Sequence, residues 1–202
     1  MTFASDGDGL CRGENRVFPV LPGERIRLDA LDHSAIPDLH EYSCDPSFYA
    51  HLEFPPFRTL AETEGYFEKL KTRSSGGKGH YWLIRLNEDG KAIGTFGVLD
   101  IDWRKGSGEI GYGLSPVFWG KGLFREALAL VLNHLFGSLG FHRVWVKTQE
   151  TNTPSLRTLE RIGFVHEGML RDFYLSQQDG QYHNAVVLAM LESEWRTLSL
   201  SR

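Results

Sequence analysis

A strand, a glycine-bearing turn and a helix follow one another in the middle of this chain, and this order most constrains its fold. Residues 106–114 have the pattern of a strand, and residues 123–136 place apolar side chains on one helical face. Between them, Gly120 and Gly122 let the backbone turn without a Cβ in the way. Free amides at a helix start form an anion site. The segment therefore predicts either a cradle for an anion or a plain tight bend.

The rest of the chain surrounds this unit with strands before it and strand–helix–strand units after it. A capping box, Thr59 with Glu62, starts a helix that ends at residues 74–77. Further helices are expected at 33–43 and 154–162, a loop at 46–57, and strands at 25–28, 81–86, 92–101, 144–148, 164–172 and 183–191. Antiparallel hairpins followed by helical connections predict an α/β (α+β) fold. We expect one mixed, mostly antiparallel central sheet with helices on both faces.

Composition limits the function. The 202 residues carry 22 Lys and Arg against 26 Asp and Glu, a net charge of −4, which disfavours a nucleic-acid binder. Two cysteines and histidines without metal-ligand spacing predict neither a disulfide scaffold nor a metal site. No apolar run is long enough for a membrane span, and no secretory signal begins the chain. We expect a cytoplasmic protein with one domain at residues 24–196 and a mobile leader at residues 1–23, whose end lies against the domain.

Two common nucleotide cradles do not fit the glycine turn. The dinucleotide fingerprint needs a third glycine, where this chain has Arg125. The phosphate loop needs Ser or Thr after its lysine, whereas Lys121 is followed by Gly122. An anion bound here would therefore belong to another class of ligand.

A second signal lies at residues 151–164, after the strand expected at 144–148. Thr153 suits a helix cap, Pro154 the first helical position and Gly163 the residue after the helix. A well-capped short helix explains these three but does not require Asn152 or Ser155. Polar groups at the carboxyl end of a strand lie where open sheets usually bind ligands.

Together the two stretches resemble the GNAT superfamily of acetyl-coenzyme A-dependent N-acetyltransferases, and most closely its ribosomal-protein (RimJ/RimL-type) branch. The phosphate motif of that superfamily, Q/R-x-x-G-x-G/A, corresponds to residues 117–122, with Val117 in place of the opening Gln or Arg. E-I-G-Y at 109–112 and the N-x-x-S…L-x-x-x-G-F pattern at 152–164 reinforce the likeness. It covers roughly residues 24 to 194, and its ordered pair of motifs is fairly specific.

The resemblance implies a cofactor site for acetyl-coenzyme A. The amides from Trp119 to Phe124, which include those of Gly120, Lys121, Gly122 and Leu123, would face its diphosphate. Lys121 and Arg125 would add positive charge. Asn152 would hold the pantetheine arm by its amide, unless it is only a helix cap.

The resemblance also implies the chemistry. An amine attacks the thioester directly in a ternary complex, with Glu109 as the general base through water, and the amide of Leu114, near a strand bulge, stabilises the oxyanion. Ser155 donates to the leaving sulfur, because the tyrosine of many relatives is replaced by Leu159. Glu109 as a salt-bridged strand residue and Ser155 as an ordinary helix-start serine are the alternatives.

The acceptor is less defined by the sequence. The loop at residues 51–54 lies where the family builds its acceptor pocket, and the acceptor is a primary amine, either a protein N-terminus or a small molecule. Cys44, the one cysteine inside the expected domain, falls in the first helix, away from the cleft motifs. A homodimer is possible. The alternative function is a non-catalytic sensor that binds acyl-coenzyme A without turnover.

Overall fold

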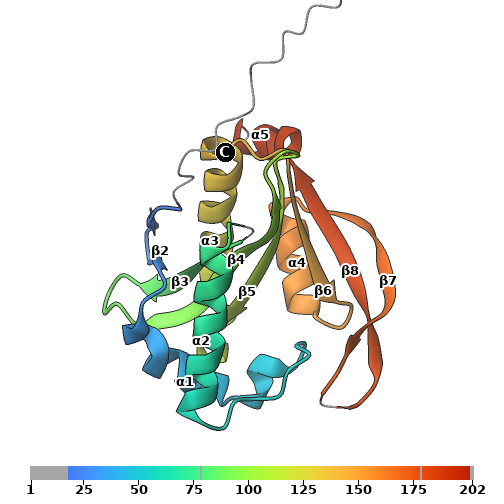
Figure 1. Ribbon diagram of the computed structural model, residues 1–202. Helices are drawn as coiled ribbons and strands as arrows, with labels where there is room; N and C mark the ends of the chain where they lie inside the picture. Colours follow the sequence, from blue (N-terminus) through green and yellow to red (C-terminus); the bar gives the residue numbers. More distant parts are fainter. Residues whose placement is uncertain (1–17, 78, 178, 201–202) are drawn as a thin grey trace, which may run out of the picture.

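The computed structural model describes residues 18–77, 79–177 and 179–200 (Figure 1). In this part of the chain eight strands form one sheet in the order β1-β2-β3-β4-β5-β6-β8-β7. The strands are β1 (Leu21–Pro22), β2 (Ile26–Ala30), β3 (His80–Leu86), β4 (Ala92–Asp102), β5 (Ser107–Leu114), β6 (Arg143–Gln149), β7 (Val165–Leu175) and β8 (Tyr182–Leu191). Only β5 and β6 pair in parallel among these described strands, so the expected mixed, mostly antiparallel sheet is confirmed.

The helices follow the expected pattern with small differences. They are α1 (Ile36–Ser43), α2 (Leu60–Ser75), α3 (Leu123–Leu132), α4 (Thr153–Ile162) and α5 (Glu192–Leu200). The capping box of Thr59 and Glu62 is present at the start of α2. The helix expected to reach residue 136 changes at Leu132 into a π-helical segment, Asn133–Ser138, in which three consecutive residues are buried. The expected loop at 46–57 contains one short 3-10 turn, Pro46–Tyr49.

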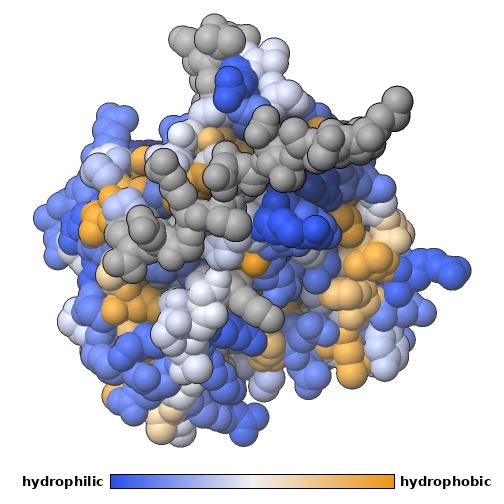
Figure 2. All heavy atoms as spheres, turned by 45° about the horizontal axis from the view of Figure 1, so that its top comes forward, coloured by the Kyte–Doolittle hydropathy of each residue, from blue (hydrophilic) through white to orange (hydrophobic). Residues whose placement is uncertain are grey.

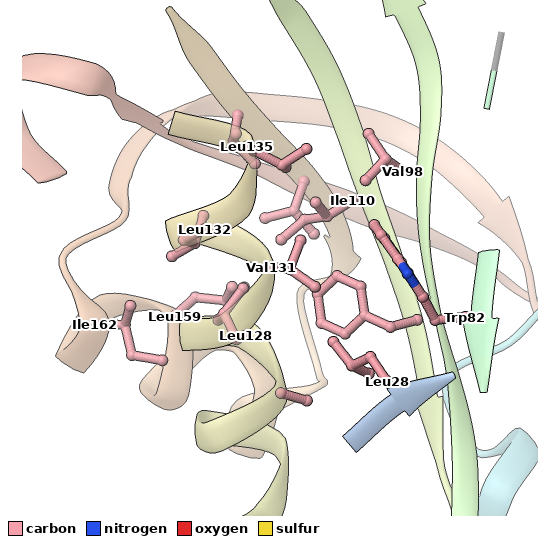
Figure 3. Close-up of a cluster of buried hydrophobic side chains, with 14 of the residues drawn as sticks. Leu28, Trp82, Val98, Ile110, Leu128, Val131, Leu132, Leu135, Leu159 and Ile162 are labelled. Atoms are coloured by element: carbon pink, nitrogen blue, oxygen red, sulfur yellow. The ribbon is translucent and has the colours of Figure 1, made fainter. Parts of the chain in front are cut away.

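Helices cover both faces of the sheet and bury two apolar clusters. On one face, α3 and α4 direct Leu128, Val131 and Leu159 toward the sheet, where they meet Trp82 and Ile110 (Figure 3). On the other face, α1 and α2 pack on β3 and β4 around a smaller cluster that consists of Ala35, Ile36, Leu39, Tyr42, Phe67, Leu83 and Ala92. Because successive strand residues alternate between faces, the central strands β3 and β4 contribute to both clusters.

The end of the expected leader lies against the domain. Leu21 and Pro22 pair with Leu28 and Arg27 of β2, and the ring of Phe18 stacks on His80 with centroids 4.1 Å apart. The rest of the expected leader, residues 1–17, lies outside the described residues. No helix in the described ranges combines the length and apolar character that a membrane crossing requires.

Candidate active site

The two parallel strands at the centre of the sheet separate after a short pairing. Residues Ser107–Glu109 of β5 pair with Arg143–Trp145 of β6, and beyond these three pairs the strands diverge (Figure 1). The remaining part of β5, residues 110–114, therefore has a strand partner only on its β4 side within the described structure. Apart from the carbonyl of Leu114, which accepts the indole N–H of Trp119, its backbone groups on the β6 side are left to an extended ligand or to solvent.

The amide of Leu114 points into this gap. Ser115 donates its N–H to the carbonyl of Ile93 at 2.8 Å. The neighbouring residues Gly94 and Leu114 are therefore a non-hydrogen-bonded pair of the antiparallel ladder between β4 and β5. The N–H and C=O of Leu114 consequently face β6, and its carbonyl accepts the indole N–H of Trp119 at 2.7 Å. The register of β4 and β5 is regular from Gly94 to Leu99, so the expected bulge near Leu114 is absent from this stretch. The divergence of the strands, rather than a bulge, exposes the amide.

A cavity of about 310 Å³ opens between the separated strands. Its central walls are residues 110–113 of β5 and 146–149 of β6. The expected acceptor loop takes part, since residues 51–54 line the cavity. Aromatic rings complete it: Tyr42, Phe48, Tyr49, Phe57, Tyr66, Tyr81 and Tyr174.

Two glycines of β5 shape the cavity on the face that α1 and α2 cover. A Cβ on Gly113 would lie 2.7 Å from Cζ of Phe48, closer than real Cβ contacts come. The absence of a side chain therefore lets the aromatic segment at Pro46–Tyr49 reach the strand. A Cβ on Gly111 would lie 3.2 Å from Cδ1 of Leu99. Glu109 shares this face by the alternation of the strand.

Glu109 is buried and paired. Its Oε2 lies 3.5 Å from Nζ of Lys147 on β6, and its side chain is 11% exposed. Burial raises the pKa of the Glu109 carboxyl above its usual value, and the ammonium of Lys147 opposes part of that rise. Lys147 lines the cavity. Glu109 is not part of the lining and contacts Lys147 from behind it. A carboxylate with a raised pKa is suited to accept a proton near neutral pH.

The start of α3 offers unpaired amides, as the glycine turn indicated. Gly120 and Gly122 both adopt left-handed φ, +71° and +78°, and Gly122 is the N-cap without a side-chain cap. Within the described residues no acceptor takes the amide hydrogens of residues 121–125. Trp119 was expected to contribute as well, but its N–H donates to Pro116 O at 3.1 Å. The set of free donors therefore starts after Trp119.

The side chains around these amides divide into core and surface. Leu123 is buried, and the ring of Phe124 packs on Tyr112 with centroids 4.2 Å apart, so both anchor the first turn. Lys121 and Arg125 are exposed, and Nζ of Lys121 lies 5.1 Å from the ring centre of Phe118. Two exposed cations thus flank the amides.

The start of α4 brings a hydroxyl pair to the gap. The cap is Asn152 rather than Thr153, because its Oδ1 accepts the N–H of Ser155 at 3.3 Å. Ser155 Oγ lies 2.6 Å from the phenol oxygen of Tyr112 on β5. Burial raises the pKa of Tyr112 to about 12, although the hydrogen bond with Ser155 lowers it, so the phenol stays protonated. Leu159 is fully buried in the core.

Sequence reasoning missed several groups at this site. Tyr112 entered the sequence analysis only as the last residue of the E-I-G-Y motif, and its contact with Ser155 joins residues 43 positions apart. Lys147 and Gln149 sit on a strand identified by its apolar residues alone. His51 Nδ1 lies 2.9 Å from Gln149 Oε1, which ties the acceptor loop to β6. Contacts between residues so far apart in the chain cannot be predicted from local sequence patterns.

Comparison with known proteins agrees with this geometry. The family model described as an acetyltransferase (GNAT) domain matches residues 25–165. The uncharacterized N-acetyltransferase YoaA of Bacillus subtilis is 31% identical over 170 residues, which cover 84% of this chain and 96% of that protein. A crystal structure of an acetyltransferase from T. thermophilus superposes with a TM-score of 0.80 at 28% identity, covering 92% of this chain and 96% of that one.

One relative has a named protein substrate. The alanine N-acetyltransferase of ribosomal protein uS5 from Escherichia coli is 31% identical over 86 residues, 43% of each chain. The chain belongs to the GNAT acetyltransferase family. It is an N-acetyltransferase, and its co-substrate is acetyl-coenzyme A.

Proposed function

We propose that this chain binds acetyl-coenzyme A across the gap between β5 and β6 and transfers the acetyl group directly to a primary amine. The observation that carries the proposal is the uncapped start of α3, whose free amides adjoin a gap lined by unpaired strand groups. Anions bind such helix starts through amide hydrogens and the helix dipole. A diphosphate at α3 would lead an extended pantetheine arm along residues 110–114.

Each residue at the gap then has its own role in the reaction. Glu109, through water, takes the proton that the ammonium must lose before its nitrogen attacks the thioester carbon. The amide of Leu114 stabilises the negative oxygen that forms as the carbon–nitrogen bond is made. As the carbon–sulfur bond breaks, the departing thiolate takes the second proton that the attacking nitrogen releases. Ser155 donates a hydrogen bond to this sulfur, and the phenol of Tyr112, 2.6 Å away, donates to Ser155 Oγ. Asn152 uses Oδ1 as a cap, which leaves its NH₂ group for the pantetheine arm.

For the acceptor we infer an amine at a chain end or on a small molecule. A cavity of about 310 Å³ admits such a group but not a folded surface. The uS5 relative makes a protein N-terminus one candidate, and the carboxylate of Glu53 on the cavity wall would attract an ammonium in either case. A cytoplasmic site of action remains our expectation. For the homodimer that the sequence leaves open, the exposed apolar residues Met169 and Phe173 of β7 are candidate contacts, and Figure 2 shows apolar side chains gathered on the right of the molecule.

A thiol-release assay with acetyl-coenzyme A tests this function. Amino-terminal peptides, polyamines and amino sugars are offered in turn, and we expect release well above hydrolysis with at least one of them. Initial rates at varied concentrations of both substrates should give intersecting lines, and Cys44→Ser should leave them unchanged, because Cys44 is exposed at the end of α1. Parallel lines would contradict direct transfer. Tight binding without turnover of any amine would favour the sensor alternative.

A further inference from the structure

Arg25, at the start of β2, reaches the glycine turn from 96 positions away. Its Nη1 donates to the carbonyl of Lys121 at 2.9 Å, and its Nε donates to Glu126 Oε2 at 2.9 Å. Its backbone N–H also donates to Glu126 Oε1 at 2.8 Å. One residue thus holds both the turn before α3 and the first turn of α3.

The contact with Lys121 sets the direction of an amide. A trans peptide points its C=O and the following N–H in opposite directions. Because Arg25 holds the carbonyl of Lys121, the N–H of Gly122 points away from Arg25, toward the side where no described protein group covers the free amides. Gly122 has left-handed φ and no side chain to resist rotation, so an external contact is what can fix this peptide.

The contact with Glu126 removes a charge that would oppose an anion. Glu126 lies in the first turn of α3, next to the amides proposed to bind the diphosphate. A carboxylate there would repel a phosphate group if it were left unpaired. Arg25 pairs with it, and the hydrogen bonds of Arg25 outweigh the effect of burial and lower the pKa of Glu126.

Besides Arg25, the indole N–H of Trp119 ties the turn to β5 through the carbonyl of Leu114. A hollow of about 550 Å³ flanks Lys121 and Leu123 on the side of β2 and β3. Val117, the first residue of the glycine motif, is apolar and 67% exposed, so it offers the turn no polar contact. The segment that carries Arg25 is itself anchored, since the side-chain amide of Asn87 donates to the carbonyls of Gly23 and Glu24 at 3.1 Å.

We propose that Arg25 is a positioning residue for the coenzyme: it orients the amides of the glycine turn toward the diphosphate and neutralises Glu126 beside them. The inference rests on the diphosphate site proposed above. It assigns to the start of β2 a part in donor binding that the glycine motif alone does not contain.

The test compares acetyl-coenzyme A with S-acetylpantetheine, which lacks the diphosphate. The unaltered protein should prefer acetyl-coenzyme A in kcat/KM. In Arg25→Met the KM for acetyl-coenzyme A should rise by about tenfold or more, the effect of losing one charge-assisted contact, with kcat little changed. With S-acetylpantetheine, kcat/KM should stay within about twofold. The double variant R25M/E126Q should recover part of the KM, because it also removes the unpaired carboxylate.

Arg27→Met is the matched control, since Arg27 lies two residues further along the chain, in β2, and pairs with Asp29 instead. It should leave the preference between donors intact. Equal losses with both donors in Arg25→Met would mark a merely structural role and overturn the inference, as would an unchanged KM for acetyl-coenzyme A. If the unaltered protein uses both donors equally well, the diphosphate site itself is wrong.

Discussion

At the scale of single residues, burial raises the pKa of two groups at the site, with different consequences for what each group can do. Tyr112 is kept protonated by burial and can donate a hydrogen bond, whereas burial makes Glu109 a stronger proton acceptor. Lys147 lies 3.5 Å from Glu109 and opposes part of that effect. Acetyl transfer to an amine requires a base that accepts the proton of the ammonium and a hydrogen-bond donor that stays protonated beside the leaving sulfur.

The role of Glu109 predicts a pH dependence. Only the ionised carboxylate can accept a proton, so kcat/KM should fall as the pH drops through the raised pKa of Glu109. Glu109→Gln should remove this acidic limb and lower kcat/KM by about 100-fold or more. Lys147→Met removes the cation that lowers the pKa, and the limb should move to higher pH. Rate profiles against pH check both variants.

His51 provides the control for that prediction, because it is a second titratable group on the cavity wall. His51→Gln should leave the acidic limb where it is. A limb that disappears in His51→Gln but persists in Glu109→Gln would show that His51 is the base.

At the scale of elements, local sequence predicted starts and ends well. The capping box at Thr59, the left-handed Gly163 after α4 and the glycine turn before α3 all appear as expected, because the residues that form each of them are neighbours in the sequence. Of the two caps that the sequence offered for α4, Asn152 and Thr153, the structure uses Asn152. The separation of β5 from β6 was not predicted, because it depends on pairing between strands 36 positions apart.

Asn152 has two possible roles, and two substitutions separate them. Asn152→Ser keeps an oxygen that caps α4 but loses the side-chain NH₂ group, whereas Asn152→Ala loses both. We expect only Asn152→Ala to lower the free energy of unfolding, by about 1 kcal/mol. Both should weaken coenzyme A binding. Urea denaturation and calorimetric titration measure the two effects, and normal affinity in Asn152→Ser would reduce Asn152 to a cap.

At the scale of the whole molecule, the sheet brings distant residues together in ways that sequence patterns do not encode. Arg25 meets Glu126 across 101 positions, and Phe18, near the end of the expected leader, packs on His80 and Trp82. The motif residues could be predicted because they follow one another along the chain. The contacts that Tyr112 and Lys147 make with Ser155 and Glu109 could not be predicted, because only the completed fold brings these residues together.

Two histidines whose Nε2 atoms are buried should make the stability of the fold depend on pH. Burial lowers the pKa of His80 from 6.5 to about 4 and also lowers that of His134, and Nε2 of each has no hydrogen-bond partner in the described structure. The unfolded chain therefore binds more protons than the folded chain as the pH falls from 6.5 toward 4, and stability is lost over that range. The melting temperature of the unaltered protein should therefore fall over this pH range, and that of the His80→Phe variant should fall less. His33→Gln changes an exposed histidine and is the control, which should show the same fall as the unaltered protein. A fall in His80→Phe as large as that of the unaltered protein would contradict this account.

The most direct measurement is a crystal structure of the protein with coenzyme A bound. The diphosphate oxygens should lie within hydrogen-bond distance of the amides of Gly122 to Arg125, and the sulfur should lie between β5 and β6 beside Ser155. Coenzyme A seated elsewhere, or a diphosphate that leaves those amides free, would contradict the proposed site.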